Sequence, residues 1–448
     1  MRCFDAAVIG GGILGCMTAR SLRRWNISTV LLEQEDDVCR GITRANSAIV
    51  YPGYDNKPGS LKAAMTVRGN ASVDALCAEL EVPFSRCGSL LVTYDPESVP
   101  KLERKLQNGL RNGVLGLRLL TGGEAESMEP MLRPGVAAAL YAPTTGTVNP
   151  WQLGIAAYEN ALQNGAEAML NTPVLTIRRT ENGYILETDR GPIFSKTVFN
   201  CAGLSADRVQ ELCFEPDIRL EPDSAEYLVL DPLAPKPGRV IFHQAQSCGK
   251  GITAIPCVEG NLLISGVRKP LTRPFATTAE GLEELHRAAK ELLPELEIGQ
   301  VIRSFGAVRP NPIRESGESL HDFCIENPGP GFYSLIGVKT PGLTCAHELG
   351  MHLADRAAEY LQAQPNPGFD PHRRAITGNG TADDHEIICR CEKITRGQIL
   401  EAIGRGAKTV EAIKRRLGTG MGRCQGSRCG WEIVKILKET GTDPEPLF

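Results

Sequence analysis

Two apolar runs on either side of a glycine-rich turn open the chain. Phe4–Ile9 has the length and apolar character of a buried strand, and the turn Gly10–Gly15 follows it directly. Cys16–Arg24 spaces its apolar residues at helical intervals, and Ser28–Leu32 is a second strand-like run, followed by Glu33. The pattern predicts a strand, a tight turn, a helix and a second strand, in that order.

The same alternation of strand and helix patterns returns later in the chain. It extends over Pro150–Leu212, and a helical pattern over Ala346–Leu361 completes the set. The intervening pieces, residues 72–149 and 214–319, contain many short β-type runs instead. We therefore predict an α/β domain of the Rossmann type that is interleaved with an antiparallel β-sheet domain.

A change of composition marks the C-terminal part of the chain. Residues 362–384 are rich in Gln, Pro, Asn, Gly, Thr and Asp and show no periodicity, which is typical of a linker. Short helical patterns follow over Arg396–Arg405 and Thr409–Leu417, and a further one extends from Cys429 through Lys438. These patterns predict a small helical domain at the C-terminus.

Composition and charge limit the class of protein. The chain has 448 residues, of which 42 % are hydrophobic and 23 % charged, so we expect a globular protein of two or three domains. A net charge of −4 argues against nucleic-acid binding, and the absence of an 18-residue apolar run argues against a transmembrane segment. The glycines of the first turn fit a folded element better than a secretory signal peptide. Fifteen cysteines then indicate reduced thiols in a cytoplasmic protein, with peripheral attachment to a membrane left open.

The first turn has the chemistry of a dinucleotide site. In the pattern G-x-G-x-x-G, Gly10 permits the tight turn, Gly12 lets a pyrophosphate approach the backbone, and Gly15 lets the helix pack on the strand. Glu33 lies 18 residues after Gly15, where a carboxylate can accept hydrogen bonds from both ribose hydroxyls. The motif alone does not separate FAD from NAD, but its position at the start of a long chain favours a tightly held flavin.

Four cysteines carry the strongest signal in the chain. Cys389 and Cys391 form a C-x-C pair, 32 residues separate them from Cys424, and Cys424 and Cys429 form a C-x₄-C pair. Structural zinc sites usually use C-x₂-C pairs, and the plant-type iron–sulfur spacing also differs. The spacing therefore favours a metal centre. The three interpretations are a [2Fe–2S] cluster, a zinc site and free thiols without a metal.

Beyond Glu33 the sequence resembles the D-amino-acid-oxidase-type FAD-dependent oxidoreductases, in particular glycerol-3-phosphate dehydrogenases and L-2-hydroxyglutarate oxidases. The likeness covers about residues 5–360. It rests on an ordered series of segments: Gly41–Tyr54, Pro58–Lys62, Arg68–Asn70, Arg86–Val92, Glu129-Pro130, Gly146–Pro150, Asn160–Ala166, Asn200–Asp207, Gly249–Gly251, Gly260–Leu263, Arg309 and Gly337–Thr344.

The resemblance implies roles for particular residues of the FAD site. Gly10, Gly12, Gly15 and Glu33 would hold the ADP half. The remaining residues implied at the site are Asn46 and Ser47 beside the flavin, Val174 near the adenine, Ala202 and Gly203 behind the pyrophosphate, and Gly342, Leu343 and Thr344 at the pyrimidine edge of the flavin. Backbone N–H donors at that edge stabilise the negative charge of the reduced flavin. Without the resemblance, Pro341-Gly342 would be interpreted as an ordinary turn.

The resemblance also implies a substrate site with two departures from the family pattern. Arg309 is the expected anchor of a small anionic substrate, because a guanidinium clamps carboxylate or phosphate through two hydrogen bonds, whereas pairing with Asp322 is the structural alternative. Lys250 would assist. The family commonly has a histidine where this chain has Tyr51 and a small residue where it has Pro52. A phenol is a poorer base than imidazole, so the base stays open.

The C-terminal part resembles the bacterioferritin-associated ferredoxin module, which implies a [2Fe–2S] cluster on Cys389, Cys391, Cys424 and Cys429. The segments Ile387–Glu392, Ile413–Arg416 and Gly420–Gly426 agree with that module. Between Arg405 and Arg428 there are seven Lys or Arg residues and one Glu, and we expect these cations to raise the cluster potential or to dock an acidic redox partner.

These inferences give a domain plan. The FAD-binding domain comprises residues 1–71, 150–213 and 320–363, and the substrate domain comprises residues 72–149 and 214–319. Residues 364–384 form the linker. Residues 385–448 form a small α-helical [2Fe–2S] domain.

The expected activity is that of a dehydrogenase. Because a one-electron cluster is built in, electrons are expected to leave the flavin through the cluster and not directly to O₂. Glycerol 3-phosphate is the favoured substrate, and an L-2-hydroxy acid or an amino acid is the alternative. A non-catalytic electron-transfer subunit is the alternative from another class of function. The acceptor would be a redox partner protein or a companion flavoprotein subunit.

Overall fold

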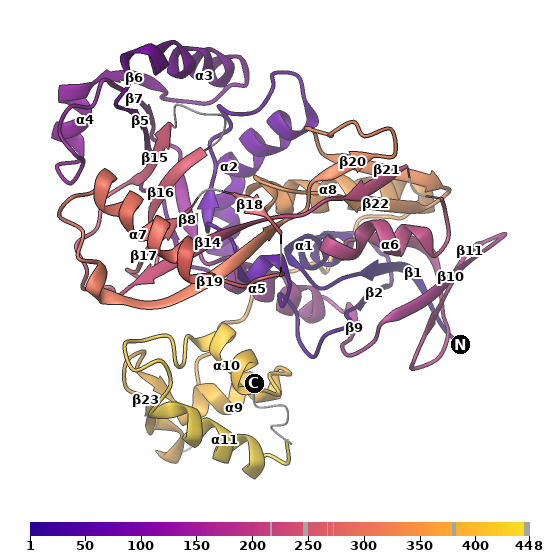
Figure 1. Cartoon of the computed structure of the whole chain (residues 1–448). Coiled ribbons are helices and arrows are strands. Elements are labelled where there is room, and N and C mark those ends of the chain that lie inside the picture. The colour runs from indigo at the N-terminus through magenta and orange to yellow at the C-terminus, as the bar shows by residue number, and fades with distance from the viewer. Residues whose placement is uncertain (216, 245–249, 267, 272, 379–381, 443–448) are drawn as a thin grey trace.

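The computed structural model describes residues 1–448 apart from 216, 245–249, 267, 272, 379–381 and 443–448. It forms two large bodies and a small one, each around its own sheet or helix core (Figure 1). The helices are α1 Ile13–Leu22, α2 Leu61–Glu79, α3 Val99–Arg111, α4 Gly122–Met128, α5 Pro150–Gln163, α6 Ala206–Glu211, α7 Ala279–Leu292, α8 Gly342–Leu361, α9 Arg396–Gly404, α10 Val410–Leu417 and α11 Cys429–Glu439.

The first body is built on a mixed sheet with a parallel centre, in the order β10-β11-β12-β1-β2-β9, with β22 beside β12 and β21 beside β22. Strands β12, β1, β2, β9 and β22 run parallel because helices cross between them. The strands are β1 Arg2–Ile9, β2 Thr29–Leu32, β9 Glu167–Met169, β10 Val174–Thr180, β11 Gly183–Thr188, β12 Ile193–Asn200, β21 Cys324–Gly329 and β22 Phe332–Ile336.

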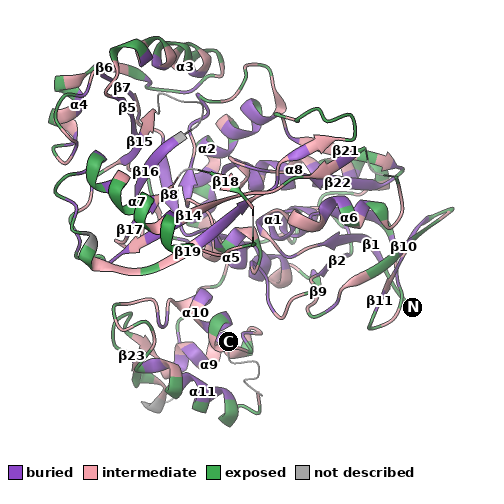
Figure 2. Ribbon diagram, in the orientation of Figure 1, coloured by how far each residue is buried: buried purple, intermediate pink, exposed green. Residues whose placement is uncertain are grey.

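Helices α1, α5 and α8 pack on one another and bury one face of this sheet (Figure 2). The four residues of β2 are all buried, as expected for a strand that is covered on both faces. The predicted α/β domain is therefore confirmed, and its parallel strands bring the carboxyl ends of β1 and β2 to the same edge.

The second body is an antiparallel sheet in the order β18-β14-β17-β16-β15-β5-β7-β6, with β19 beside β14. Among the described strand pairs of this sheet, β5 with β15 is parallel and the others are antiparallel. The strands are β5 Ser89–Thr93, β6 Arg118–Thr121, β7 Ala138–Ala142, β14 Asp223–Leu230, β15 Val240–Gln244, β16 Lys250–Pro256, β17 Leu262–Ser265, β18 Lys269–Pro270 and β19 Val301–Arg309. The interleaved antiparallel domain predicted from the short β-type runs is confirmed.

Short strands join the two large bodies. A three-stranded sheet pairs β8 with both β3 and β4, and β13 pairs with β20. These strands are β3 Ile49–Val50, β4 Phe84–Ser85, β8 Gly146–Val148, β13 Ile218–Leu220 and β20 Pro312–Arg314.

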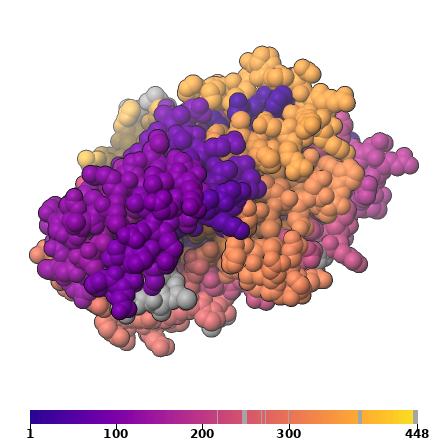
Figure 3. All heavy atoms as spheres, turned by 90° about the horizontal axis from the view of Figure 1, so that it is seen from above, coloured from indigo at the N-terminus to yellow at the C-terminus, as the bar shows by residue number. Residues whose placement is uncertain are grey.

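The predicted boundary between residues 71 and 72 falls inside α2, so this boundary stays a proposal that divides one helix. This helix continues from Leu61 to Glu79, and buried residues recur along it from Lys62 to Cys77. Gly69 lies so close to α8 that an added Cβ would be 2.1 Å from the carbonyl oxygen of Thr344. In Figure 3 the segment that carries α2 and α3 lies directly beside the orange segment of residues near 310–350. The other domain boundaries stay a proposal.

The C-terminal body contains a hairpin of β23 (Ile387–Cys389) and β24 (Ile394–Thr395) and the helices α9, α10 and α11. Its small core is separate from the cores of the large bodies and includes Ile399, Ile413 and Leu437. The predicted small helical domain is thus confirmed, and we call residues 385–442 the cluster module.

The segment before the cluster module is not a free linker. Residues 364–375 have no helix or strand, yet they lie along the first body, where Asn366 donates to the carbonyl of Arg23 at 2.9 Å. Asp370 receives an amide hydrogen bond on its carbonyl from Asn160 at 3.1 Å. Composition predicted the missing periodicity correctly, but it does not reveal that polar side chains of other elements anchor an irregular segment.

Among the helices of the described residues, none combines the length and the apolar character needed to cross a membrane.

Candidate active site

The turn between β1 and α1 can be built only with glycine at two positions. Gly10 has a φ of +101°, and a Cβ there would lie 2.6 Å from the carbonyl oxygen of Cys201. A Cβ on Gly15 would lie 1.8 Å from the carbonyl oxygen of Gly10. The close approach of helix and turn leaves the N-terminus of α1 facing outward, where its N–H groups can receive an anion.

Substitution of Gly15 by alanine tests this geometry. Overpacking of this kind typically costs about 1–3 kcal/mol, so we expect the FAD dissociation constant of Gly15→Ala to rise about 10- to 100-fold. Gly123→Ala in α4 is the matched control, because nothing lies within 4 Å of a Cβ there. Equal FAD affinity in the two variants, measured by quenching of flavin fluorescence, contradicts the prediction.

Glu33 lies at the carboxyl end of β2, beside the glycine turn. Its Oε2 accepts a hydrogen bond from the N–H of Gly11 at 2.5 Å, and its Oε1 accepts one from the N–H of Glu35 at 2.9 Å. Burial raises the pKa of Glu33, although these N–H groups act in the opposite sense. The carboxylate is therefore held in one place at the wall of the adjoining cavity.

A cavity of about 1360 Å³ extends from this turn to the antiparallel sheet. This volume is larger than a small substrate alone needs, and both large bodies contribute to the cavity walls. Ten of the twelve predicted cofactor residues line it: Gly10, Gly12, Glu33, Asn46, Ser47, Val174, Ala202, Gly203, Gly342 and Leu343. Gly15 and Thr344 do not line it: Gly15 lies against the carbonyl of Gly10, and Thr344 Oγ1 accepts a hydrogen bond from the N–H of Tyr51 at 2.9 Å.

Helix α8 points its N-terminus at this cavity. The sequence pattern placed the start of the helix at Ala346, whereas the structure begins it at Gly342, directly after Pro341. The N–H of Gly342 is already used, because it donates to the carbonyl of Lys339 at 2.8 Å. The first N–H groups of a helix have no intrahelical acceptor, so the N–H of Leu343 can be a hydrogen-bond donor where the predicted pyrimidine edge of the flavin would lie. The donor set therefore fits a group that gathers negative charge.

Arg309, the last residue of β19, lines the same cavity, and its Nε is buried without a hydrogen-bond partner among the described residues. The alternative partner Asp322 is used elsewhere, because its carboxylate accepts from the N–H groups of Leu61 and Lys62 at 2.9 and 2.7 Å. An arginine with a buried, unused donor is suited to an anionic ligand.

Two further cations lie beside Arg309, and the sequence reasoning missed both. Lys339 and Arg268 line the cavity with it, and Lys339 is only 8 % exposed. Burial, followed by the positive charges of Lys62 and Arg268, lowers the pKa of Lys339. The signal in the sequence was a lysine two residues before Pro341 in an otherwise apolar and glycine-rich stretch.

Tyr51 forms part of the wall between the predicted flavin and substrate sites. Its ring stacks on Phe242 with a centroid distance of 6.1 Å, and its Oη lies 3.4 Å from Ser47 Oγ. His243, the next residue on β15, packs edge-on against Tyr94 at a ring-centroid distance of 5.9 Å. Since adjacent strand residues point to opposite faces, the His243 ring lies away from Tyr51. The side chain of Lys250 lies outside the described residues.

The four predicted ligand cysteines come together in the cluster module as two pairs. Cys391 Sγ and Cys424 Sγ are 3.7 Å apart. Burial, and then the neighbouring thiol of Cys389, raises the pKa of Cys429 to about 11. In the described part of the chain, no group of three or more His, Cys, Asp or Glu side chains has the arrangement of a site for one metal ion. Two thiol pairs fit a cluster of two irons, in which each iron takes two thiolates.

Much of the predicted basic patch pairs with carboxylates inside the molecule, so less of it is open to a redox partner, and its effect on the cluster potential stays a prediction. Arg415 and Arg416 are buried against Asp37, and Arg405 pairs with Glu159 and Glu401. Sequence shows the excess of positive charge but not the carboxylates that the first body places opposite it.

Comparisons with known proteins agree with both parts of the site. The family described as "FAD dependent oxidoreductase" matches residues 5–356, and the family described as "BFD-like [2Fe-2S] binding domain" matches residues 387–439. The chain belongs to the FAD-dependent oxidoreductase family. Its cofactors are FAD and, in the cluster module, a [2Fe–2S] cluster.

Two relatives of this oxidoreductase are named as dehydrogenases of different substrates. A glycerol 3-phosphate dehydrogenase of Caloramator mitchellensis is 37 % identical over an alignment of 464 positions, which covers 98 % of this chain and 95 % of the relative. An L-2-hydroxyglutarate dehydrogenase of Indibacter alkaliphilus is 28 % identical over 78 % of this chain and 97 % of its own length.

A solved structure agrees with the fold of the first two bodies. L-α-glycerophosphate oxidase of Mycoplasma pneumoniae with FAD bound superposes with a TM-score of 0.77 at 24 % identity. The match covers 83 % of this chain and 98 % of the oxidase.

Proposed function

We propose that this oxidoreductase is a glycerol-3-phosphate dehydrogenase that passes electrons from FAD to its own [2Fe–2S] cluster. The observation that carries the proposal is the convergence of Arg268, Arg309 and Lys339 on one part of the cavity wall. Burial, and then the positive charges of Lys62 and Arg268, lowers the pKa of Lys339. A dianionic ligand would offset these positive charges. A phosphate monoester brings three oxygens to one point and can accept hydrogen bonds from several of these cations at once.

The side chains divide the work of the site. When bound, FAD supplies the hydride acceptor and the cluster supplies a one-electron carrier. Arg309 and Lys339 hold the anionic group, and Tyr51, backed by Ser47, orients the hydroxyl that is oxidised. The N–H groups at the start of α8 stabilise negative charge beside them. Lys250 stays a predicted assistant.

A specific observation also supports L-2-hydroxyglutarate as the second candidate. Lys101, Arg104 and Lys105 on α3 line the same cavity, and Lys105 pairs with Asp55. These cations would suit the second carboxylate of a dicarboxylic hydroxy acid.

An anaerobic visible spectrum separates the two candidates. Purified protein is titrated with glycerol 3-phosphate and, separately, with L-2-hydroxyglutarate, and the flavin band near about 450 nm is followed. Bleaching by glycerol 3-phosphate at the lower concentration is expected. Bleaching by L-2-hydroxyglutarate alone would assign the other substrate, and bleaching by neither would overturn the proposal.

Lys339 gives the substrate affinity an expected pH dependence. Because its pKa is lowered from the ordinary 10.5, Lys339 loses its proton, and so its attraction for the anion, at a lower pH than a free lysine. KM for glycerol 3-phosphate should therefore rise with pH on the alkaline side, below about pH 10. In Lys339→Met, KM should be higher throughout and lack this rise, whereas Lys196→Met, a distant exposed lysine paired with Asp5, should keep it. Identical pH profiles in both variants contradict this role.

We propose that the electron acceptor is an acidic redox protein or a companion flavoprotein subunit that binds at the exposed side of the cluster module. There Cys391 is exposed, and the exposed Arg390 and Lys393 flank it. The second-order rate of electron transfer to such an acceptor should fall as ionic strength rises. A rate that is independent of salt would argue against this surface.

A further inference from the structure

A pair of arginines on α10 of the cluster module binds one buried carboxylate of the first body. Arg416 makes a two-pronged contact, from Nη1 to Asp37 Oδ2 at 2.8 Å and from Nη2 to Asp37 Oδ1 at 2.9 Å. Arg415 Nη2 donates to Asp37 Oδ2 at 2.7 Å. The side chains of Asp37 and Arg416 are 0 % and 1 % exposed, so water does not compete for these hydrogen bonds.

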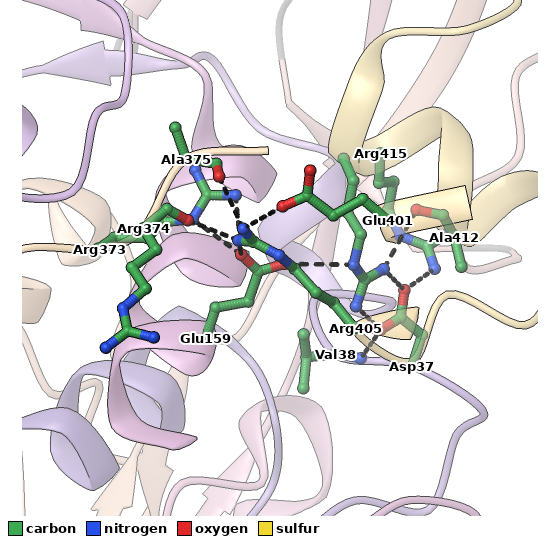
Figure 4. A network of polar contacts seen from close by, with 11 residues as sticks. Asp37, Val38, Glu159, Arg373, Arg374, Ala375, Glu401, Arg405, Ala412 and Arg415 are labelled. Atoms are coloured by element: carbon green, nitrogen blue, oxygen red, sulfur yellow. Dashed lines mark hydrogen bonds and ion pairs between the residues drawn. The ribbon is translucent and has the colours of Figure 1, made fainter. Parts of the chain in front are cut away.

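A second carboxylate extends the same contact. Glu159 of α5 pairs with Arg373 at 2.8 Å and with Arg405 at 3.1 Å, and Arg416 Nε lies 3.5 Å from it. Figure 4 shows Asp37 and Glu159 side by side, with guanidinium groups of the cluster module and of the preceding segment directed at them. Arg423 contacts a third acid, Asp231 of the antiparallel domain, at 3.0 Å.

These contacts fix the cluster module in one position. Burial by itself would raise the pKa of Asp37, but the hydrogen bonds and charges of Arg416 and Arg415 outweigh it, and the pKa is lowered. A buried charge is stable only with its partners in place, and the bidentate geometry admits one orientation. We call Asp37, Arg415 and Arg416 the clamp.

Asp37 lies in the middle of a loop whose other side belongs to the dinucleotide site. Toward the glycine turn, the N–H of Cys39 donates to the carbonyl of Gly11 at 2.8 Å, and Thr43 Oγ1 accepts from the N–H of Ile13 at 3.0 Å. The same loop begins at Glu33, and residues 33–35 and 40–44 line the FAD cavity. One short loop is therefore held by the cluster module on one side and by the cofactor site on the other.

We propose that the clamp couples docking of the cluster module to occupation of the adenosine half of the FAD site. Since both contacts need the same conformation of residues 33–44, FAD binding favours the docked module and the docked module favours FAD binding. The coupling is reciprocal, and it is independent of which substrate the enzyme oxidises.

The first test measures FAD affinity of the full-length protein after removal of the cofactor and titration with FAD. Arg416→Gln and Asp37→Asn are expected to raise the FAD dissociation constant by roughly tenfold, within the 5- to 150-fold range typical of such couplings. Arg396→Gln is the matched control, because Arg396 pairs with Glu439 of the module and with Asp384 directly before it, and with no acid in the described part of the first body. Its FAD affinity should be unchanged. An equal rise in all three variants, or no rise in Arg416→Gln and Asp37→Asn, overturns the proposal.

The second test measures the reverse direction without relying on any variant. Hydrogen–deuterium exchange of α10 is compared in FAD-loaded and FAD-free protein that retains its iron. Faster exchange in the FAD-free protein is expected, and exchange that is independent of FAD overturns the proposal. If Arg416→Gln fails to retain iron, two measurements still test the proposal. They are the exchange of α10 with and without FAD, and the FAD affinity of Asp37→Asn, which alters no residue of the module.

Discussion

Arg309→Ala is expected to lower kcat/KM for glycerol 3-phosphate by about 10²- to 10³-fold, because removal of a buried charge partner from an anion costs about 2–5 kcal/mol. The guanidinium has a buried Nε without a partner in the described part of the structure, so its hydrogen-bonding capacity is available to the substrate. Arg309→Lys should lose less than Arg309→Ala, since the charge stays while the two-pronged geometry is lost. The measurement is the anaerobic rate of flavin reduction as a function of substrate concentration.

Arg314→Ala serves as the control for this substitution. Arg314 lies on β20 and pairs at the surface with Asp217, with 38 % of its side chain exposed. An exposed pair contributes little, so kcat/KM should stay within about twofold of the unaltered enzyme. If Arg309→Ala behaves like Arg314→Ala, Arg309 is not the substrate anchor, and Arg268 and Lys339 would have to carry the anion.

Cys391→Ser is expected to remove the cluster. It should thereby separate flavin reduction by the substrate from electron delivery to the acceptor. Each of the four thiolates is a predicted ligand, so loss of one should reduce bound iron from about two atoms per chain to near zero. Electron delivery to a one-electron acceptor should then fall about tenfold or more. Flavin reduction by substrate should change little, since Cys391 does not line the cavity.

Cys3→Ser is the matched control, because Cys3 is an exposed thiol near the N-terminus, far from the module in sequence. Iron content and visible absorbance of the cluster are measured together with electron delivery in both variants. Full iron retention in Cys391→Ser contradicts its assignment as a ligand. Full electron delivery without iron contradicts the route through the cluster.

The docked position of the cluster module bears on both predictions. If the clamp holds as proposed, the cluster has a fixed position relative to the FAD site, and its loss should not disturb substrate binding. A module on a free linker would instead deliver electrons at a rate set by its diffusion on the tether.

The sequence alone determined the elements whose chemistry is local. The turn Gly10–Gly15 is fixed by short-range sterics, because only glycine fits the positions of Gly10 and Gly15, and the strand and helix around it follow the apolar pattern. The short helices of the module are equally local, and the structure has them where the pattern predicted. The pairing of the cysteines is not local, because Cys391 Sγ lies 3.7 Å from Cys424 Sγ, 33 positions later in the chain. For residues with roles at the flavin, the family resemblance supplied what periodicity does not contain.

Only the tertiary structure decided which charges face each other. Arg309 is the last residue of β19, whereas Arg268 and Lys339 lie in two different loops, and no spacing in the sequence relates the three. The same holds for the basic segment between Arg405 and Arg428, for which the sequence predicts an open docking patch. In the structure, Arg415 and Arg416 pair in the interior with Asp37, which lies nearly 380 positions earlier in the chain. Local sterics act between neighbours in sequence, whereas the energy of a charge depends on what the fold places around it. The sequence therefore determined the cofactor turn and the ligand set, and the fold determined where the substrate cations meet and how the cluster module is held.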